Sequence, residues 1–317
     1  EIPKRDWSSD VCSSDLHIGV VLSGHTDVVP VDGQPWSSDP FKVTLRDGRL
    51  YGRGTCDMKG FLALSLAAIP DLTAAALKAP VHLAFSYDEE VGCLGAPDMI
   101  KVIANELPKP TLVVVGEPTN MEAVRGHKGI STFKVTVAGP EAHSSQTQLG
   151  ASAVMAAVKL MGELNALAER LEREADPASP FTPKHATLTI GMVQGGTAGN
   201  ILARECWFLF DLRCQAGQDP DAILEDFHAS ARTMDADLKA RFAEAGVVIE
   251  RRSNTPALAP EDDGPAEVFA RRLTGDNGPA RVVAFATEAG RFQGGGLSTV
   301  ICGPGSIDQA PPPREVV

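Results

Sequence analysis

The stretch IGVVLSGHTD, residues 18–27, decides the fold of this chain, because a buried strand runs directly into chemically active side chains. Residues 18–23 are mostly apolar and β-branched without alternation, which is typical of a strand buried on both faces. Gly24 ends the run, and His25 and Asp27 follow at once. Strands of this kind belong to parallel sheets, whose functional side chains collect where the strands end.

Outward from this stretch, predicted strands alternate with predicted helices. The strand pattern recurs at 81–87, 111–116, 281–286 and 298–302, and helical patterns cover about 59–78, 94–106 and 263–273. This alternation predicts an α/β domain with a parallel-rich sheet and helices on both faces. We expect residues 16–125 and 253–317 to form this domain.

The middle of the chain has a different pattern, in which the apolar residues of the strands alternate with polar ones. Strands are predicted at 131–137, 186–193, 205–213 and 246–250, and helices at about 151–174 and from Asp219-Pro220 to Gly246. The resulting order, β-α-β-β-α-β, is the ferredoxin-like split motif. We therefore expect a smaller ferredoxin-like domain over residues 126–252, inserted into the α/β domain.

The composition fits a two-domain globular protein. The chain has 317 residues, of which 43% are hydrophobic and 22% charged, and a single core rarely serves this length. A net charge of −12 argues against nucleic acids and anionic membranes as partners. The sequence has no apolar run of the ~20 residues that a membrane span needs and no signal-peptide pattern. Its six cysteines form no CxxC pair, which favours a reducing, cytoplasmic compartment.

The first residues of the chain fit neither pattern. RDWSSDVCSSDL, residues 5–16, repeats SSD and has neither a helical nor a strand period. Residues 1–15 are therefore interpreted either as a non-native segment or as a disordered polar start, and they take no part in the predicted fold.

Candidate metal ligands follow three predicted strands and one glycine-rich turn, and they are His25, Asp57, Glu90 and Glu117. Each has an ordinary interpretation by itself: a packed or exposed histidine, a helix-capping aspartate, and carboxylates in solvated turns. Together they are expected at one edge of one sheet, where carboxylates would raise one another's pKa. A divalent cation removes that repulsion, and one histidine with several carboxylates suits zinc, cobalt or manganese in a hydrolytic site.

These features belong to an ordered set of motifs that resembles the acetylornithine deacetylase and succinyl-diaminopimelate desuccinylase family of di-zinc amidohydrolases. The motifs run from about residue 17 to 310 and read SGHTDVVP, YGRGTCDMKG, DEEVG, VVGEPTN, GPEAHSS and GPGSIDQA. Within this family, the stretches most similar to acetylornithine deacetylases are SGHTDVVPVDGQPWSSDPF, VRGHKG and FATEAGRFQ. The resemblance implies that the inserted domain is a lid and dimerisation domain.

The resemblance also implies a metal site for two zinc ions, which cobalt can replace. His25 and Glu117 would bind the first ion, and Glu90 would bind the second. Asp57 would bridge both ions, next to a cis peptide bond with Met58.

Two further residues of the same domain receive roles from the resemblance. Glu89 would be the general base that activates water, and Asp27 would orient His25 through a hydrogen bond. Because adjacent residues of a turn point in different directions, Glu89 and Glu90 can take different roles.

Three residues of the inserted domain are implied to contact substrate. His143, in GPEAHSS, would stabilise the oxyanion while reaching across from the partner subunit of a homodimer. Asn200 would add a polar contact, and Arg213 would clamp the substrate α-carboxylate. Two alternatives stay open, namely an Asp211–Arg213 surface ion pair and an ordinary loop position for His143.

The expected function is metal-dependent hydrolysis of the amide of an N-acyl amino acid. The preferred substrate is N2-acetyl-L-ornithine, cleaved to L-ornithine and acetate in arginine biosynthesis. Succinyl-diaminopimelate desuccinylation, acetylcitrulline deacetylation and dipeptide hydrolysis are the alternatives within the same family, because the motifs do not fix the shape of the pocket.

An alternative of another class is an inactive metal-binding remnant. Pro311 stands where the resemblance implies the last histidine ligand of the second metal ion, and proline offers no donor atom. We therefore expect the second metal site to be impaired. The resemblance implies more sequence before the first metal-binding strand and a closing helix after Val317; neither is found, so both ends of the chain are expected to be truncated.

Overall fold

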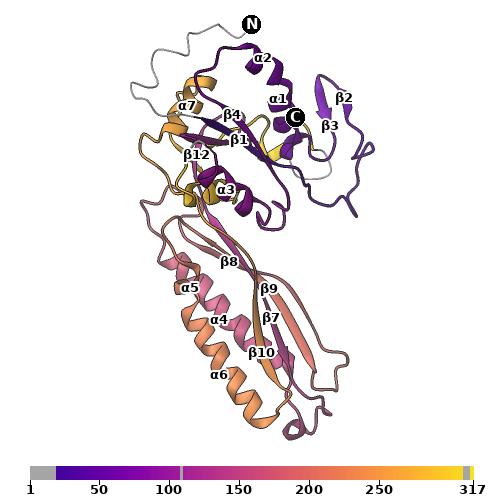
Figure 1. Ribbon diagram of the computed structural model, residues 1–317. Helices are drawn as coiled ribbons and strands as arrows, with labels where there is room; N and C mark the ends of the chain where they lie inside the picture. Colours follow the sequence, from indigo (N-terminus) through magenta and orange to yellow (C-terminus); the bar gives the residue numbers. More distant parts are fainter. Residues whose placement is uncertain (1–18, 108–109, 310–314) are drawn as a thin grey trace. The chain divides into compact units, whose positions relative to one another are not determined.

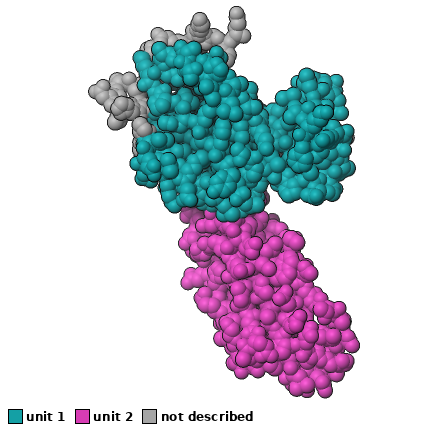
Figure 2. Space-filling view, turned by 45° about the vertical axis from the view of Figure 1, so that its right-hand side comes forward, with its two compact units in different colours: residues 1–125, 260–281, 287–317 teal, residues 126–259, 282–286 magenta. Residues whose placement is uncertain are grey.

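The computed structural model describes residues 19–107, 110–309 and 315–317, and the chain forms two compact units. Unit 1 holds the chain up to Arg125 together with Pro260–Arg281 and Thr287–Val317, and unit 2 holds Gly126–Ala259 and Val282–Ala286 (Figure 2). The predictions for residues 1–15 and for Pro311 lie outside the described residues.

The larger sheet is mixed and has the order β11-β6-β12-β5-β1-β4, of which β12, β5, β1 and β4 lie wholly in unit 1 (Figure 1). β1 pairs in parallel with β4 and with β5, β12 is parallel to β5, and β6 joins β12 in the antiparallel sense. The strands are β1 (Val20–His25), β4 (Val81–Ser86), β5 (Leu112–Val115), β6 (Val124–His127), β11 (Arg281–Val283) and β12 (Ser298–Ile301). The predicted parallel-rich α/β sheet is confirmed.

Helices cover both faces of this sheet, as predicted. Successive residues of a strand point to opposite faces of the sheet. Gly24 of β1 lies against Met58 and Leu62 on one face. Its neighbour Ser23 forms a hydrogen bond with Glu288 on the other face. The first face carries α1 (Gly60–Ala67) and α7 (Pro265–Thr274), and the second carries α3 (Ala96–Asn105) and α8 (Ala289–Gly294).

The order of the strands creates a switch point at β1. From β1 the chain crosses to β4 on one side, and from β4 it returns to β5 on the other side. In open α/β sheets, ligands bind in the crevice that such a reversal opens at the carboxyl ends of the strands. The residues that follow β1, β4 and β5 therefore meet at the natural binding position of this sheet.

The single helix predicted over 59–78 is wrong. The chain first forms an irregular turn, η1 (Thr55–Lys59), and then two short helices, α1 and α2 (Ile69–Ala74), separated at Ala68. Pro70 lies in the first turn of α2, where its missing N–H is tolerated, and it cannot continue α1. The predicted strand 281–286 is likewise shorter, because β11 ends at Val283.

A small hairpin that the sequence pattern did not indicate lies beside the turn η1. It consists of β2 (Thr44–Arg46) and β3 (Arg49–Tyr51), paired antiparallel. Residues 315–317 lie along β3: the Leu50 and Val317 main chains exchange hydrogen bonds of 2.9 and 3.1 Å. The last residues of the chain are thereby brought next to the glycine-rich turn.

Unit 2 is an antiparallel sheet in the order β10-β7-β9-β8, with its helices on one face (Figure 1). Its elements are β7 (Gly129–Ala138), α4 (Ala153–Arg173), β8 (Thr187–Gly195), β9 (Glu205–Cys214), α5 (Pro220–Ile223), α6 (Glu225–Arg241) and β10 (Gly246–Thr255). Along the chain these elements follow the order β-α-β-β-α-β of the ferredoxin-like motif, with the second helix divided into α5 and α6. Phe133, Phe208 and Phe210 pack on Leu160 and Leu164 of α4 in a fully buried core.

Two details of unit 2 differ from the prediction. The helix behind Asp219 is interrupted at Leu224 and ends at Arg241 rather than near Gly246, although Asp219 caps it as expected by accepting a hydrogen bond from the Asp221 N–H at 3.0 Å. Strand β10 continues to Thr255, so the unit extends beyond 252. Across the described residues, none of the helices has the length and apolar character needed to cross a membrane.

Candidate metal centre and active site

His25 is the centre of the candidate site. It ends β1 with 1% of its surface exposed, and its Nδ1 lies 3.0 Å from the main-chain oxygen of Asp27. Because a carbonyl only accepts hydrogen bonds, Nδ1 is the donor and Nε2 faces the opposite way. There Nε2 lies 3.0 Å from Asp57 Oδ1 and 3.8 Å from Glu117 Oε1.

The charge around Nε2 calls for a cation between the histidine and the carboxylates. Burial would lower the pKa of His25, but the hydrogen bond to Asp57 and the charges of Glu117 and Glu89 outweigh it and raise this pKa to about 11. A proton on Nε2 is therefore strongly stabilised. A divalent cation in the same place satisfies the same oxygens with a larger charge, so the donor set fits a metal ion.

Three of the predicted ligands come together directly. One ligand atom each from His25, Asp57 and Glu90 lies within 4.8 Å of the others. Glu117, after β5, is 5% exposed, and burial followed by the charges of Asp57 and Glu89 raises its pKa well above the usual range. Glu117 joins the cluster through His25, so the four predicted ligands share one site.

Glu89 and Glu90 leave the turn after β4 in different directions. Asp88, directly before them, has a φ of 54°, a left-handed backbone conformation that bends the chain. Glu90 Oε1 then accepts a hydrogen bond from Val29 N at 3.2 Å, while Glu89 Oε1 lies 3.3 Å from Cys93 Sγ. Burial raises the pKa of Glu89 to about 7, partly offset by the charge of His25. A carboxylate with this pKa can both take up and return a proton near neutrality.

Asp27 contacts both sides of the site. Its main chain accepts from His25, its carboxylate Oδ1 lies 3.4 Å from His25 Nδ1, and its Oδ2 accepts a hydrogen bond from Glu90 N at 3.1 Å. The hydrogen bond that orients His25 therefore comes from the main chain of Asp27. The side chain of Asp27 ties the loop after β1 to the turn after β4.

A carboxylate that sequence reasoning missed lies under the site. Glu288, which precedes α8, accepts hydrogen bonds from Ser23 Oγ at 2.6 Å and Ser86 Oγ at 2.7 Å. It thereby joins the ends of β1 and β4. Burial raises its pKa, and the two serines partly offset this shift. The residues it contacts are 202 and 265 positions away, so only the folded sheet reveals its place.

The predicted substrate residues of unit 2 fall into two groups. His143 and Asn200 are neighbours, because Ser144 N donates to the Asn200 main-chain oxygen at 2.9 Å and His143 bridges Ile201. Both lie beyond the end of the sheet where Ala138 pairs with Glu205. Arg213 pairs with Ile130 at the other end. Since β9 has ten residues, the two groups are about 30 Å apart along the strand.

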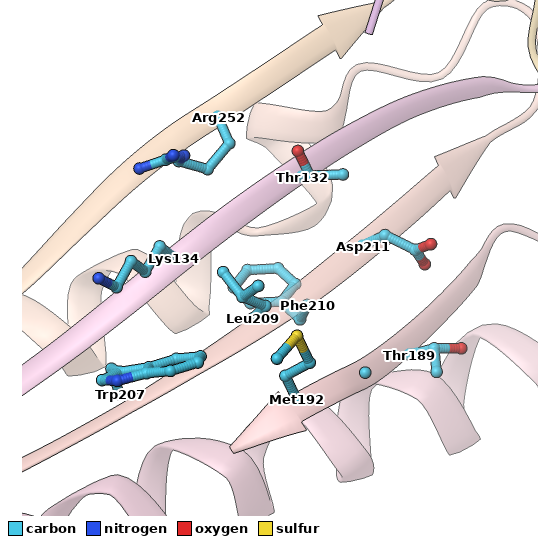
Figure 3. Close-up of a pocket in the computed structure, with 10 residues that line it drawn as sticks. Thr132, Lys134, Thr189, Met192, Trp207, Leu209, Phe210, Asp211 and Arg252 are labelled. Carbon is cyan, nitrogen blue, oxygen red and sulfur yellow. The ribbon is translucent and has the colours of Figure 1, made fainter. Parts of the chain in front are cut away.

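Arg213 does form the ion pair that its sequence context allowed. Its Nε lies 3.6 Å from Asp211 Oδ2, and both side chains are about one-third exposed. Asp211 also lines a pocket of about 540 Å³ on the open face of the sheet, bordered by Lys134, Trp207 and Arg252 (Figure 3). The Lys134 ammonium lies 5.2 Å from the centre of the Trp207 ring. No sequence pattern indicated this pocket, which is made by side chains of all four strands of the sheet.

An α/β sheet with buried carboxylates and a histidine at its switch point defines the class of the protein as a hydrolase with a candidate metal centre. The chain belongs to the Peptidase family M20/M25/M40, which it matches over residues 21–317. The predicted family is thereby confirmed.

Curated relatives include three acetylornithine deacetylases. The Proteus mirabilis enzyme is 33% identical over 303 residues, which cover 94% of this chain and 74% of the relative. The Myxococcus xanthus enzyme is 37% identical and covers 91% of this chain and 72% of the relative. The Salmonella typhimurium enzyme is 34% identical, with 94% and 75% covered.

Solved structures of low identity share the fold. The M20 family metallo-carboxypeptidase Sso-CP2 from Sulfolobus solfataricus aligns with a TM-score of 0.72 at 18% identity, covering 96% of this chain and 82% of that chain. Human carnosine dipeptidase 1 aligns with a TM-score of 0.65 at 18% identity, covering 94% and 76%.

Proposed function

We propose that this protein hydrolyses the amide bond of an N-acyl amino acid, with N2-acetyl-L-ornithine as the preferred substrate. The observation that carries the proposal is the meeting of His25, Asp57 and Glu90 at the switch point of the sheet, with Glu89 beside them. The acetylornithine deacetylases among its relatives support the choice of substrate.

The residues that would hold a divalent metal are His25, Asp57, Glu90 and Glu117. Zinc suits this mixture of imidazole and carboxylate, and cobalt accepts the same ligands. When bound, the metal supplies a Lewis acid that acidifies water and polarises the amide carbonyl. Position 311, where the sequence predicts a lost ligand, is outside the described residues. The number of metal ions per chain is therefore a quantity to measure.

Glu89 would carry the proton through the reaction. As the water oxygen attacks the carbonyl carbon, the Glu89 carboxylate accepts the proton that the water loses. As the carbon–nitrogen bond breaks, Glu89 returns this proton to the leaving amine nitrogen, and acetate and the free amino acid result. Its pKa of about 7 suits both transfers.

The separation of His143 and Arg213 within one chain supports the proposal of a homodimer. The two lie at opposite ends of a ten-residue strand, so they cannot contact one small substrate together. We propose that Arg213 clamps the substrate carboxylate, and that His143 with Asn200 serves the site of the partner subunit.

Exposed apolar side chains on unit 2 are compatible with such a dimer. Met155 and Val158 on α4 and Val193 on the edge strand β8 are 64%, 51% and 58% exposed. We expect the wild-type protein to sediment as a dimer and Val158→Glu to sediment as a monomer, with its helical circular dichroism unchanged. A monomeric wild type would exclude this arrangement.

Product release from a panel of substrates tests the main proposal. Protein loaded with zinc or cobalt is assayed for amine release from acetylornithine, acetylcitrulline, succinyl-diaminopimelate and a dipeptide. We expect the highest kcat/KM for acetylornithine and loss of turnover after chelation. A higher kcat/KM for another substrate would assign the chain to that activity. Metal binding without turnover of any of them would identify an inactive metal-binding remnant.

A further inference from the structure

We infer that Glu315 is a positioning residue for Asp57: its buried carboxylate fixes the turn that presents the Asp57 side chain to the candidate metal centre. The inference rests on the proposed function in one respect only, which is that Asp57 binds the metal. Glu315 is not one of the candidate metal ligands, and it acts through the main chain of residues 54–57.

The carboxylate of Glu315 accepts four hydrogen bonds from residues 53–57. Its Oε1 accepts hydrogen bonds from the main-chain N–H groups of Cys56 and Asp57, both at 2.9 Å. Its Oε2 accepts from Gly54 N at 2.8 Å and from Arg53 Nη1 at 2.7 Å. A carboxylate has about four acceptor positions, and the residue is 0% exposed, so no water competes for them.

The turn depends on these bonds because it is not a regular helix. Asp57 and Met58 have non-helical backbone angles, and Gly54 has a φ of 80°. The N–H groups at such a start have no carbonyl of a preceding helical turn to bond. Leaving several of them unpaired in the interior would be costly, so one buried carboxylate that pairs three of them selects this conformation over others.

Glu315 is itself held from the opposite side. Arg53 neutralises its charge, and Arg53 Nη2 donates to Gln34 Oε1 at 2.9 Å. The main-chain oxygen of Glu315 accepts from Gly52 N at 3.3 Å, and Val317 pairs with Leu50 of the hairpin. A buried ion pair adds little to stability by itself, but it selects one geometry where many hydrogen bonds converge on it.

The test compares Glu315→Gln and Glu315→Asp with the wild type. The glutamine keeps the size but turns an NH₂ group toward N–H donors. The aspartate keeps the charge but is one methylene shorter, and it serves as the test if the glutamine variant does not fold. Zinc affinity is measured by calorimetry, and the absorption spectrum of bound cobalt reports the ligand geometry. We expect at least a tenfold weaker affinity and an altered cobalt spectrum in both variants.

Asp276→Asn is the matched control. Asp276 also accepts two main-chain N–H groups, from Ala123 and Gly278, and pairs with two arginines in the same unit, but it has no contact with the cluster. It should lower the melting temperature and leave zinc affinity within twofold of the wild type.

The outcomes separate this inference from the proposed function. If the wild type binds metal and both Glu315 variants bind it as tightly with the same cobalt spectrum, the positioning role is overturned while the proposed function stands. If Asp276→Asn weakens metal binding as much as the Glu315 variants do, the effect is general destabilisation and the inference is also overturned. A wild type that binds neither zinc nor cobalt overturns the proposed function, and the role assigned to Asp57 with it.

Discussion

Among single residues, His25 and two of the carboxylates around it all have raised pKa values, for different reasons. Burial raises the pKa of Glu89 and of Glu117, and the same carboxylates raise that of His25 to about 11 despite its burial. The oxygens of the site favour a concentrated positive charge among them. This arrangement is expected of a site that binds a cation and handles a proton beside it.

Glu89→Gln tests the proton carrier. The amide keeps the shape of the side chain but cannot accept the proton of water, so kcat should fall by about 10²–10⁴-fold. Because Glu89 is not among the three clustered donors, metal content should stay at the wild-type level. Steady-state assays with acetylornithine measure kcat, and atomic absorption measures the metal content of each protein.

Asp88→Asn is the matched control for this variant. Asp88 is exposed in the same turn, and its φ of 54° is one that asparagine adopts readily. Its kcat should stay within about twofold of the wild type. Equal losses in both variants would show that the turn, and not the proton transfer, is what Glu89→Gln disturbs.

His127 should make stability depend on pH. It is 0% exposed, and burial lowers its pKa to about 4, against 6.5 for an unperturbed histidine. Between these values the unfolded chain binds a proton that the folded protein does not, so stability is full above pH 6.5 and is lost as the pH falls toward 4. Between pH 7 and pH 5 the loss is about 2 kcal/mol.

Urea unfolding of the wild type and of His127→Asn at both pH values isolates this effect. Other groups titrate in the same range, so the informative quantity is the difference between the two proteins. The variant should lose about 2 kcal/mol less than the wild type between pH 7 and pH 5. Equal losses would mean that His127 titrates alike in the folded and unfolded states.

The residues of the site differ in how visible they are in the sequence. His25, Glu90 and Glu117 each follow an apolar strand, so the sequence pattern alone places them at one edge of the sheet. Glu288 and Glu315 are isolated carboxylates whose partners lie more than 200 positions away. Glu288 lies in the stretch FATEAGRFQ, but this pattern does not give it a role, and only the three-dimensional sheet and hairpin reveal the contacts of the two carboxylates.

Among the elements, α4 shows why strong periodicity predicts well. The predicted helix, about 151–174, is observed at Ala153–Arg173, because its apolar stripe faces a single sheet and Ser152 caps its start. Elements without such a stripe were missed: β6 has four residues and the hairpin strands β2 and β3 have three each. Short strands take their conformation from neighbours that are distant in sequence.

Leu164→Ala tests the core that α4 builds in unit 2. Leu164 is 0% exposed among the phenylalanines of β7 and β9, so the cavity should cost about 2–5 kcal/mol. Glu163→Ala, at an exposed position of the same helix, should change stability by less than about 0.5 kcal/mol. Urea unfolding followed by circular dichroism gives both values, and similar values would mean that α4 does not pack as described.

For the whole molecule, the division into two units gives each unit a buried cluster, whereas the candidate metal ligands lie in one unit only. A buried cluster of unit 1 lies around β5, β12 and α7, and one of unit 2 lies around β7, β9, α4 and α6; among the described residues these two clusters have no member in common. The candidate metal ligands all belong to unit 1. Each unit therefore has its own source of stability, and a metal ion adds to only one of them.

This separation predicts that calorimetry resolves two thermal transitions, one for each unit, and that only one of them responds to metal. Saturation at about 100 times the dissociation constant stabilises the state that binds metal by about 2.7 kcal/mol. For a unit of this size, this stabilisation corresponds to a rise in its melting temperature of about 5–10 °C. Chelation should therefore lower the transition of unit 1 by this amount and leave the other in place. Leu164→Ala should lower the second transition alone, which identifies it as unit 2. If chelation and Leu164→Ala instead shift one common transition, the two units unfold together, and the metal site stabilises the whole chain.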